Sequence, residues 1–129
     1  MDFSRYENLR ALVRANFSET TQRLVDEALE YADGKLAGVC RYDGAPMLDH
    51  AAAVASIVIS EVGLGRNSAV SSILHDVVRL AHKERPADEF LALTEEIRNR
   101  FGEQVVGITM GLANISELKL KTSKEQADN

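Results

Sequence analysis

Two neighbouring side chains that could bind a metal, His75 and Asp76, interrupt the apolar segment "SSILHDVVRLAH". Imidazole and carboxylate groups are ligands for divalent transition metals and manganese. Adjacent residues of a helix differ by about 100° around its axis, so both side chains can reach one ion above the same edge of the helix. A closed site needs more ligands, and a His-Asp pair in a helix is commonly a hydrogen-bonded structural pair. The pair alone leaves both interpretations open.

A third candidate ligand, His50, comes just before the apolar segment "AAAVASIVIS". The short turn "GLGRN" separates this segment from the one that carries His75, so two helices joined by it are expected to lie antiparallel. Because His75 lies near the middle of its helix, ideal packing alone would not bring His50 opposite it. The spacing by itself therefore does not complete a metal site.

The elements that must position these residues are helices. Apolar residues recur three and four positions apart through most of the chain, and no alternating strand pattern competes with them. Ser18 is the predicted N-cap of the second helix, and the turn at Asp43-Gly44 predicts a loop that carries Arg41 and Tyr42. The fold class is therefore predicted to be all-α, with the helices packed as an irregular bundle. The predicted helices span about 4–16, 18–34, 49–63, 67–85, 88–101 and 103–113.

Composition excludes several classes of partner. The formal net charge of −5 argues against a nucleic-acid surface, and Lys119, Lys121 and Lys124 fit a solvated face. The single cysteine, Cys40, allows no intramolecular disulfide and does not suggest secretion. No apolar run approaches the roughly 20 residues that span a bilayer. We therefore expect one cytoplasmic domain that binds neither DNA nor a membrane.

Four ordered blocks, "RYDGAPMLDH", "ILHDVVRL", "FGEQVVGITMGLANIS" and "EQADN", resemble the N-terminal hydrolase domain of long RelA/SpoT enzymes. Those enzymes make and destroy the bacterial alarmones guanosine tetraphosphate and pentaphosphate, (p)ppGpp, in the stringent response. The resemblance covers about residues 20–129. It implies the all-helical fold of the HD-domain superfamily, which agrees with the helical periodicity.

The resemblance also implies a ligand set. In the family a metal, typically Mn²⁺, would be held by His50, His75 and Asp76, and the fourth ligand would lie past the end of this chain. Residues 1–129 are thus expected to form one HD-type domain that is incomplete at its C-terminus. Asp128 matches a family acid that is not a metal ligand.

Nucleotide contacts are implied in the same way. The family's nucleotide-contacting Arg corresponds to Arg41, whose planar guanidinium would stack on guanine. A basic residue usually follows it, and here that position is Tyr42. Tyr42 could stack on a base but cannot neutralise phosphate.

This chain departs from the family at two acidic positions. Active members read His-Asp-x-x-Glu-Asp, and this chain has Arg79 and Leu80 in place of the two acids. Arg is effectively always protonated and Leu has no proton to exchange, while general acid–base help is worth about 10²–10⁴ in rate. Arg79 lies three positions after Asp76, on the same helix face, so we expect its guanidinium to pair with Asp76 in place of a metal. The alternative is that Arg79 points to solvent and a metal still binds.

Three functions remain open from the sequence. The first is a regulatory, hydrolase-like domain that has lost (p)ppGpp hydrolysis and acts on a synthetase domain of the same protein, where GTP pyrophosphokinase activity would lie. The second is an active Mn²⁺-dependent (p)ppGpp 3′-pyrophosphohydrolase, and the third is a helical interaction module that is not an enzyme. Metal content separates the first two, and binding of a guanine nucleotide separates the third from both.

Overall fold

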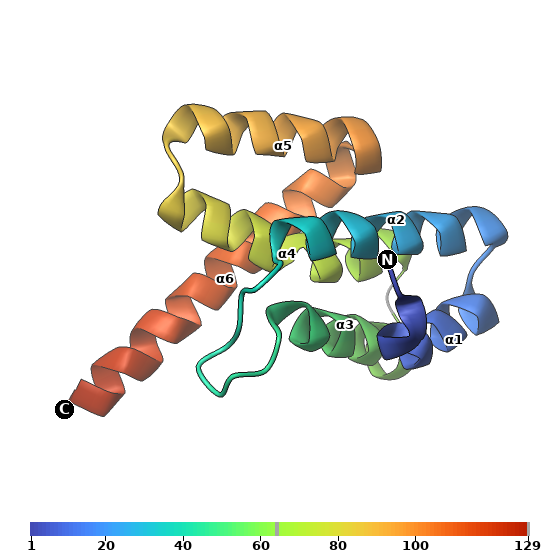
Figure 1. Ribbon diagram of the computed structural model, residues 1–129, viewed down its shortest axis with the longest axis horizontal. Coiled ribbons are helices and arrows are strands. Elements are labelled where there is room, and N and C mark those ends of the chain that lie inside the picture. The colour runs from blue at the N-terminus through green and yellow to red at the C-terminus, as the bar shows by residue number, and fades with distance from the viewer. Residues whose placement is uncertain (64, 129) are drawn as a thin grey trace.

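Helices make up nearly all of the regular structure (Figure 1). The computed structural model describes the backbone of residues 1–63 and 65–128 and the side chains of residues 1–63 and 65–115. The lysines at 119, 121 and 124 and the aspartate at 128 therefore lie outside the described side chains. No strand forms within these limits, which confirms the predicted all-α fold. The helical elements are η1 (Phe3–Tyr6), α1 (Glu7–Asn16), α2 (Glu19–Lys35), α3 (Met47–Ile57), η2 (Val58–Val62), α4 (Arg66–Glu84), α5 (Ala87–Phe101) and α6 (Glu103–Asp128).

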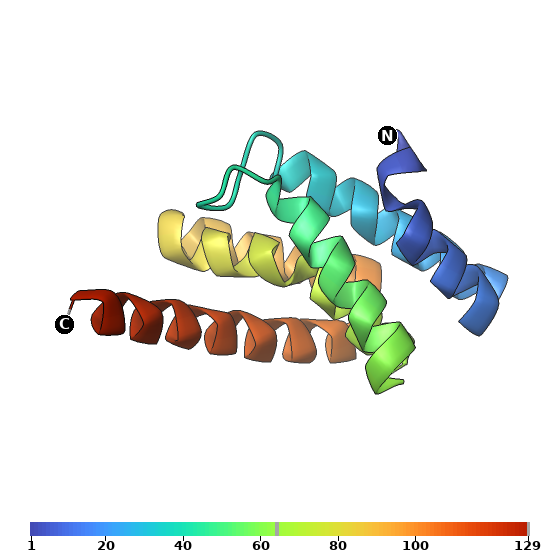
Figure 2. The same cartoon turned by 90° about the horizontal axis from the view of Figure 1, so that it is seen from below.

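Helix α4 is the centre of the bundle. It contacts α2, α3, α5 and α6, and it runs alongside α6 in the same direction (Figure 2). Ser71 on α4 donates a hydrogen bond from its hydroxyl to the backbone oxygen of Val105 on α6, over 3.2 Å. Residues 69–79 of α4 are all buried, so this stretch has no face left for solvent. The candidate residues of α4 are therefore held in the interior, where an unpaired charge is costly.

The predicted helix starts are right at α2 and wrong at α3. The hydroxyl of Ser18 accepts a hydrogen bond from the backbone N–H of Thr21, as expected of an N-cap. The third helix was predicted to start at residue 49, but α3 already starts after Pro46 and has Asp49 in its first turn. The fixed φ of Pro46, −57°, suits the residue that precedes a helix. Asp49 is thereby free to contact the N-terminal segment.

The turn between α3 and α4 also differs from the prediction. The expected single helix ends as an α-helix at Ile57 and continues as one π-helical turn to Val62. Gly63 then stops it with φ +73°, a left-handed conformation that favours glycine. Helix α4 starts at Arg66 after Gly65, one residue before the predicted start at residue 67.

Helix α6 is longer than predicted. The expected end near residue 113 is wrong, because the helix continues to Asp128 and runs beyond the other helices (Figure 1). The sequence after Gly111 has no glycine or proline and contains several Leu, Lys, Glu and Ala residues, which favour helix. Within the described residues, none of the helices combines the length and the apolar composition that crossing a membrane requires.

Candidate functional site

A buried ion pair lies at the middle of α4. Nε of Arg79 donates a hydrogen bond to Oδ1 of Asp76 over 3.0 Å. Arg79 is 8% exposed and Asp76 is 3% exposed, so the pair is almost completely removed from water. The predicted pairing of these two residues is thus confirmed, and the alternative orientation of Arg79, toward solvent, is wrong, while binding of a metal here remains a prediction.

His75 is fixed by the helix backbone. Its Nδ1 lies 2.6 Å from the carbonyl oxygen of Ser72, one turn earlier. A carbonyl oxygen can only accept, so Nδ1 carries the proton and, in the neutral ring, Nε2 carries the lone pair. Nε2 lies 3.4 Å from Oδ1 of Asp76, the same oxygen that accepts from Arg79. His75 therefore turns its potential ligand atom toward the ion pair.

The other carboxylate oxygen of Asp76 is unusual. Oδ2 is buried and has no hydrogen-bond partner among the described residues. A buried carboxylate oxygen without a partner normally costs free energy, because it has lost its hydration. Arg79 offsets the charge of Asp76 through Oδ1 and leaves this second oxygen without a donor.

His50 lies in the electrostatic neighbourhood of this pair. It is half-buried on α3, and its burial lowers its pKa. The charge of Arg41 lowers the pKa of His50 further and that of Asp76 raises it, with smaller effects of His75 and Asp43. The fold thus brings His50 and Arg41 toward the His-Asp pair of α4.

A tight loop presents Arg41 and Tyr42. The backbone N–H of Arg41 donates to the oxygen of Ala45 over 2.8 Å, and Asp43 accepts from the N–H of Ala45 through Oδ1 over 3.0 Å. Gly44 has φ +87°, which this turn requires. Tyr42 is 94% exposed, and the guanidinium carbon of Arg41 lies 5.7 Å from the centre of its ring. The loop therefore offers a planar cation and an exposed ring side by side.

The sequence did not reveal how α3 is held at this end. Arg5 pairs with Asp49 at 2.5 Å, and the hydroxyl of Tyr6 donates to Asp49 over 3.1 Å. Asp49 precedes His50, so the N-terminal segment restrains the first turn of the helix that carries this histidine. No spacing rule links residues 5 and 6 to residue 49, so no signal in the sequence indicated these contacts.

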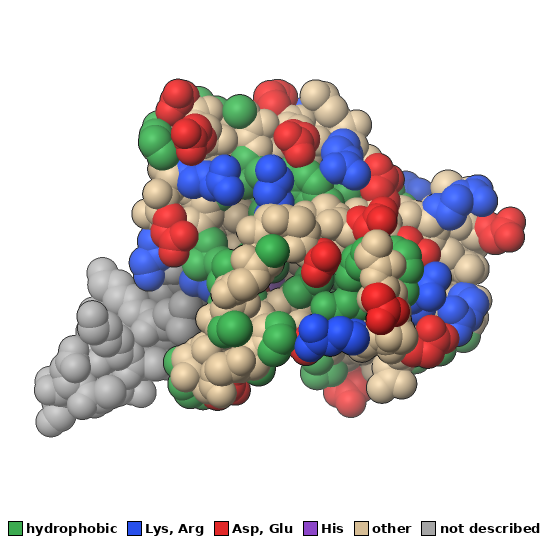
Figure 3. All heavy atoms as spheres, viewed as in Figure 1, with side chains coloured by type: hydrophobic (Ala, Val, Ile, Leu, Met, Phe, Trp, Pro, Cys, Tyr) green, Lys and Arg blue, Asp and Glu red, His purple; other side chains and the backbone are tan. Residues whose placement is uncertain are grey.

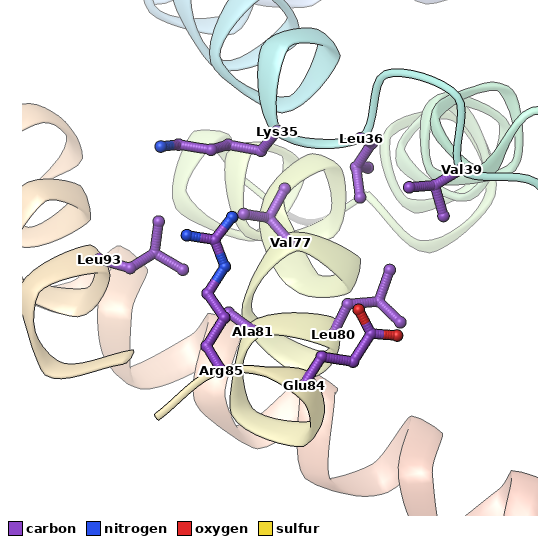
Figure 4. Close-up of a pocket in the computed structure, with 9 residues that line it drawn as sticks. All are labelled: Lys35, Leu36, Val39, Val77, Leu80, Ala81, Glu84, Arg85 and Leu93. Carbon is purple, nitrogen blue, oxygen red and sulfur yellow. The ribbon is translucent and has the colours of Figure 1, made fainter. Parts of the chain in front are cut away.

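Leu80 takes no part in the ion pair. Its side chain lines a small cavity with Lys35, Leu36 and Val39, and none of His50, His75 and Asp76 lines that cavity (Figure 4). The two positions at which the family carries acids therefore point to different places here.

A divalent metal does not fit the described residues well. Over the part of the chain with described side chains, no group of three or more His, Cys, Asp or Glu is arranged to hold an ion. Arg79 already supplies a positive charge to Asp76, and it would repel a divalent cation at the same carboxylate. The assignment of His50, His75 and Asp76 as ligands remains a prediction.

Comparison with known proteins gives a consistent result. A family model for the HD domain matches residues 28–129. The chain is 30% identical over 105 residues to a guanosine-3′,5′-bis(diphosphate) 3′-pyrophosphohydrolase of Aquifex aeolicus (strain VF5), covering 81% of this chain and 13% of that protein. The Haemophilus influenzae protein of the same name is 32% identical over 93 residues, 71% of this chain and 12% of that protein. A probable GTP pyrophosphokinase of Mycobacterium leprae is 32% identical over 103 residues, 80% of this chain and 12% of that protein. The chain thus spans about one eighth of the length of these relatives.

Proposed function

Because this chain belongs to the HD domain family, we propose that it is a hydrolase-like domain of the RelA/SpoT type that no longer hydrolyses (p)ppGpp. The observation that carries the proposal is the buried ion pair between Arg79 and Asp76. In this proposal the guanidinium takes over the role of a bound cation, so the carboxylate keeps its neutralising partner without a metal. Under this proposal the domain keeps its fold and loses the hydrolysis of (p)ppGpp.

The loss of activity has two physical causes under this proposal. Arg79 and Leu80 cannot exchange a proton with an attacking water, which removes general acid–base help worth about 10²–10⁴ in rate. The fixed charge of Arg79 also lowers the affinity of the Asp76 carboxylate for a second cation. No step of hydrolysis is therefore assigned to the residues of this chain.

A guanine nucleotide remains the proposed ligand. Arg41 and Tyr42 lie together on the loop between α2 and α3, and a guanidinium and an exposed ring are both suited to stacking on a base. We propose that (p)ppGpp or a related guanine nucleotide binds at this loop in the cytoplasm. Nucleotide binding at the loop would then change the activity of a synthetase domain of the same protein, so that the HD domain acts as a regulator.

The test is turnover of guanosine tetraphosphate with Mn²⁺ by the wild type and by the double variant Arg79→Glu/Leu80→Asp, in a chain extended past Asn129. Activity in the double variant alone supports the proposal, and equal activity in both contradicts it. The matched control is Arg23→Glu, which reverses one charge at an exposed position of α2 and should leave the result unchanged.

A second candidate is the Mn²⁺-dependent hydrolase. The observation in its favour is the unpartnered Oδ2 of Asp76, an atom to which a cation could still bind. Tight Mn²⁺ binding by the wild type, together with turnover, would favour this candidate over the degenerate site.

A further inference from the structure

A small cavity lies where the C-terminal ends of α2 and α4 meet α5, and neither His75 nor Asp76 lines it. Its volume is about 60 Å³, and Figure 4 shows its lining. Val77, Ala81 and Leu93 form an apolar floor, and Leu80 closes one side. The polar residues at its rim, Lys35, Glu84 and Arg85, are exposed.

Two cations line this cavity. In Figure 4 the guanidinium of Arg85 extends over Val77 toward the Lys35 chain, while the carboxylate of Glu84 is turned to the other side, beside Leu80. Among the described residues, neither Lys35 nor Arg85 has an ion-pair partner. Two like charges at one cavity repel each other, and an anion between them would remove that repulsion.

Tyr31 adds an independent observation. Its side chain is 6% exposed, and its hydroxyl is buried without a hydrogen-bond partner among the described residues. The ammonium group of Lys35 lies 5.6 Å from the centre of the Tyr31 ring. Burial raises the pKa of Tyr31, as does the charge of Glu96, whereas Arg100 and Arg85 lower it. The hydroxyl therefore remains a neutral donor that lies close to Glu96 as well as to these cations, and Tyr31 itself does not line the cavity.

The surface over this junction carries further positive charge. Figure 3 shows a row of Lys and Arg side chains between α5 and α2. Arg100 belongs to α5, and its guanidinium carbon lies 4.9 Å from the ring of Tyr31. Arg100 also pairs with Glu27 at 3.2 Å, so part of its charge is already compensated. Among the described residues that line the cavity, Lys35 and Arg85 are the cations, and the described ion pairs include neither.

We propose that Lys35 and Arg85 form a binding site for a phosphate group, in a cavity that neither the His-Asp pair nor Arg41 and Tyr42 line. A buried water needs roughly 10–15 Å³ of accessible space. A cavity of about 60 Å³ is several times this minimum. Charge-assisted donors such as guanidinium and ammonium groups are the usual partners of phosphate oxygens.

A purely structural role is the competing explanation. Lys35 is in the last turn of α2 and Arg85 directly follows α4, and cations stabilise helix C-termini. That role needs no ligand and predicts no response to phosphate. The two explanations therefore differ in a measurable way.

The test is the thermal unfolding of the 129-residue chain in inorganic phosphate against chloride at equal ionic strength, with calorimetry for affinity. Phosphate should raise the unfolding temperature of the wild type. Lys35→Gln or Arg85→Gln should each weaken binding about tenfold, and the double variant should bind none. Glu84→Gln, which removes the acid at the cavity, should tighten binding, whereas Arg23→Gln on the exposed face of α2 should have no effect.

A wild type that responds equally to phosphate and chloride would overturn the proposal. An unchanged phosphate response in the double variant would do the same. A guanosine diphosphate arm tells whether the phosphate is free or belongs to a nucleotide. In the titration with guanosine diphosphate, Arg41→Gln should weaken only binding at the loop, and Lys35→Gln only binding at the cavity. Failure of the phosphate site and failure of the proposed nucleotide site therefore give different results.

Discussion

The hydroxyl of Tyr6 donates a hydrogen bond to Oδ1 of Asp49 over 3.1 Å, although 43 positions separate the two residues. Burial of Tyr6, together with this hydrogen bond, raises the pKa of Tyr6 from 10.0 to about 12. The contact therefore links the N-terminal segment to the first turn of α3 in a way that depends on the protonation of one phenol.

Stability should fall as the pH rises from about 10 to about 12. In this window the unfolded chain has lost the Tyr6 proton and the folded chain still holds it, so added base favours unfolding. A difference of two pKa units is worth up to about 3 kcal/mol. Urea unfolding across this range should give a shallower loss for Tyr6→Phe than for the wild type, and identical slopes would contradict the assignment.

Breaking the buried ion pair should be costly. Arg79→Leu leaves the Asp76 carboxylate buried without its cation, and we expect a loss of about 3–5 kcal/mol in the free energy of unfolding. Arg98→Leu removes a surface pair of the same spacing with Glu95, together with a surface pair with Glu103, and should cost less than about 1 kcal/mol per pair. The double variant Arg79→Leu/Asp76→Leu should recover much of the loss. Equal losses of stability for Arg79→Leu and Arg98→Leu would mean that the pair between Arg79 and Asp76 is hydrated.

Manganese affinity should rise when Arg79 loses its charge. Arg79→Gln removes a cation hydrogen-bonded to Asp76, and the lost repulsion should strengthen Mn²⁺ binding by at least about tenfold. Calorimetric titration with MnCl₂ measures this directly, with Arg98→Gln as the charge-matched control. A wild type that already binds as tightly as the variant would contradict the proposed substitution of the metal by Arg79.

The start of α2 offers a test of the local structure. Ser18→Ala removes the acceptor for the N–H of Thr21 and should cost about 1 kcal/mol, whereas Ser18→Asn should cost little. Thermal unfolding of both variants checks this. An equal loss of stability in both variants would show that the size of the side chain at position 18 matters more than its hydrogen bond to the N–H of Thr21.

Local patterns were enough to predict much of this fold. The apolar spacing predicted the helices, and the three-residue spacing from Asp76 to Arg79 predicted their pairing. The long end of α6 was missed because its weak periodicity outweighed a helix-favouring composition. The π-helical turn at Val58–Val62 was missed because hydrophobic spacing does not distinguish it from an α-helix.

The candidate site was less predictable than the fold. The contacts of Arg5 and Tyr6 with Asp49 depend on tertiary packing across more than 40 positions. The cavity between α2 and α5 depends on how two helix ends meet. Neither the contacts of Asp49 nor the cavity produces a periodic pattern of residues in the sequence. The unpartnered hydroxyl of Tyr31 likewise follows from packing, since its sequence neighbours are ordinary helix residues.

The positive charge beside Asp76 is covalently part of α4. A bound ion dissociates and obeys mass action, so the stability it confers depends on its concentration. A guanidinium on the same chain is present in every molecule as soon as it folds. Neither metal starvation nor a chelator could therefore withdraw this partner from the interior of the bundle.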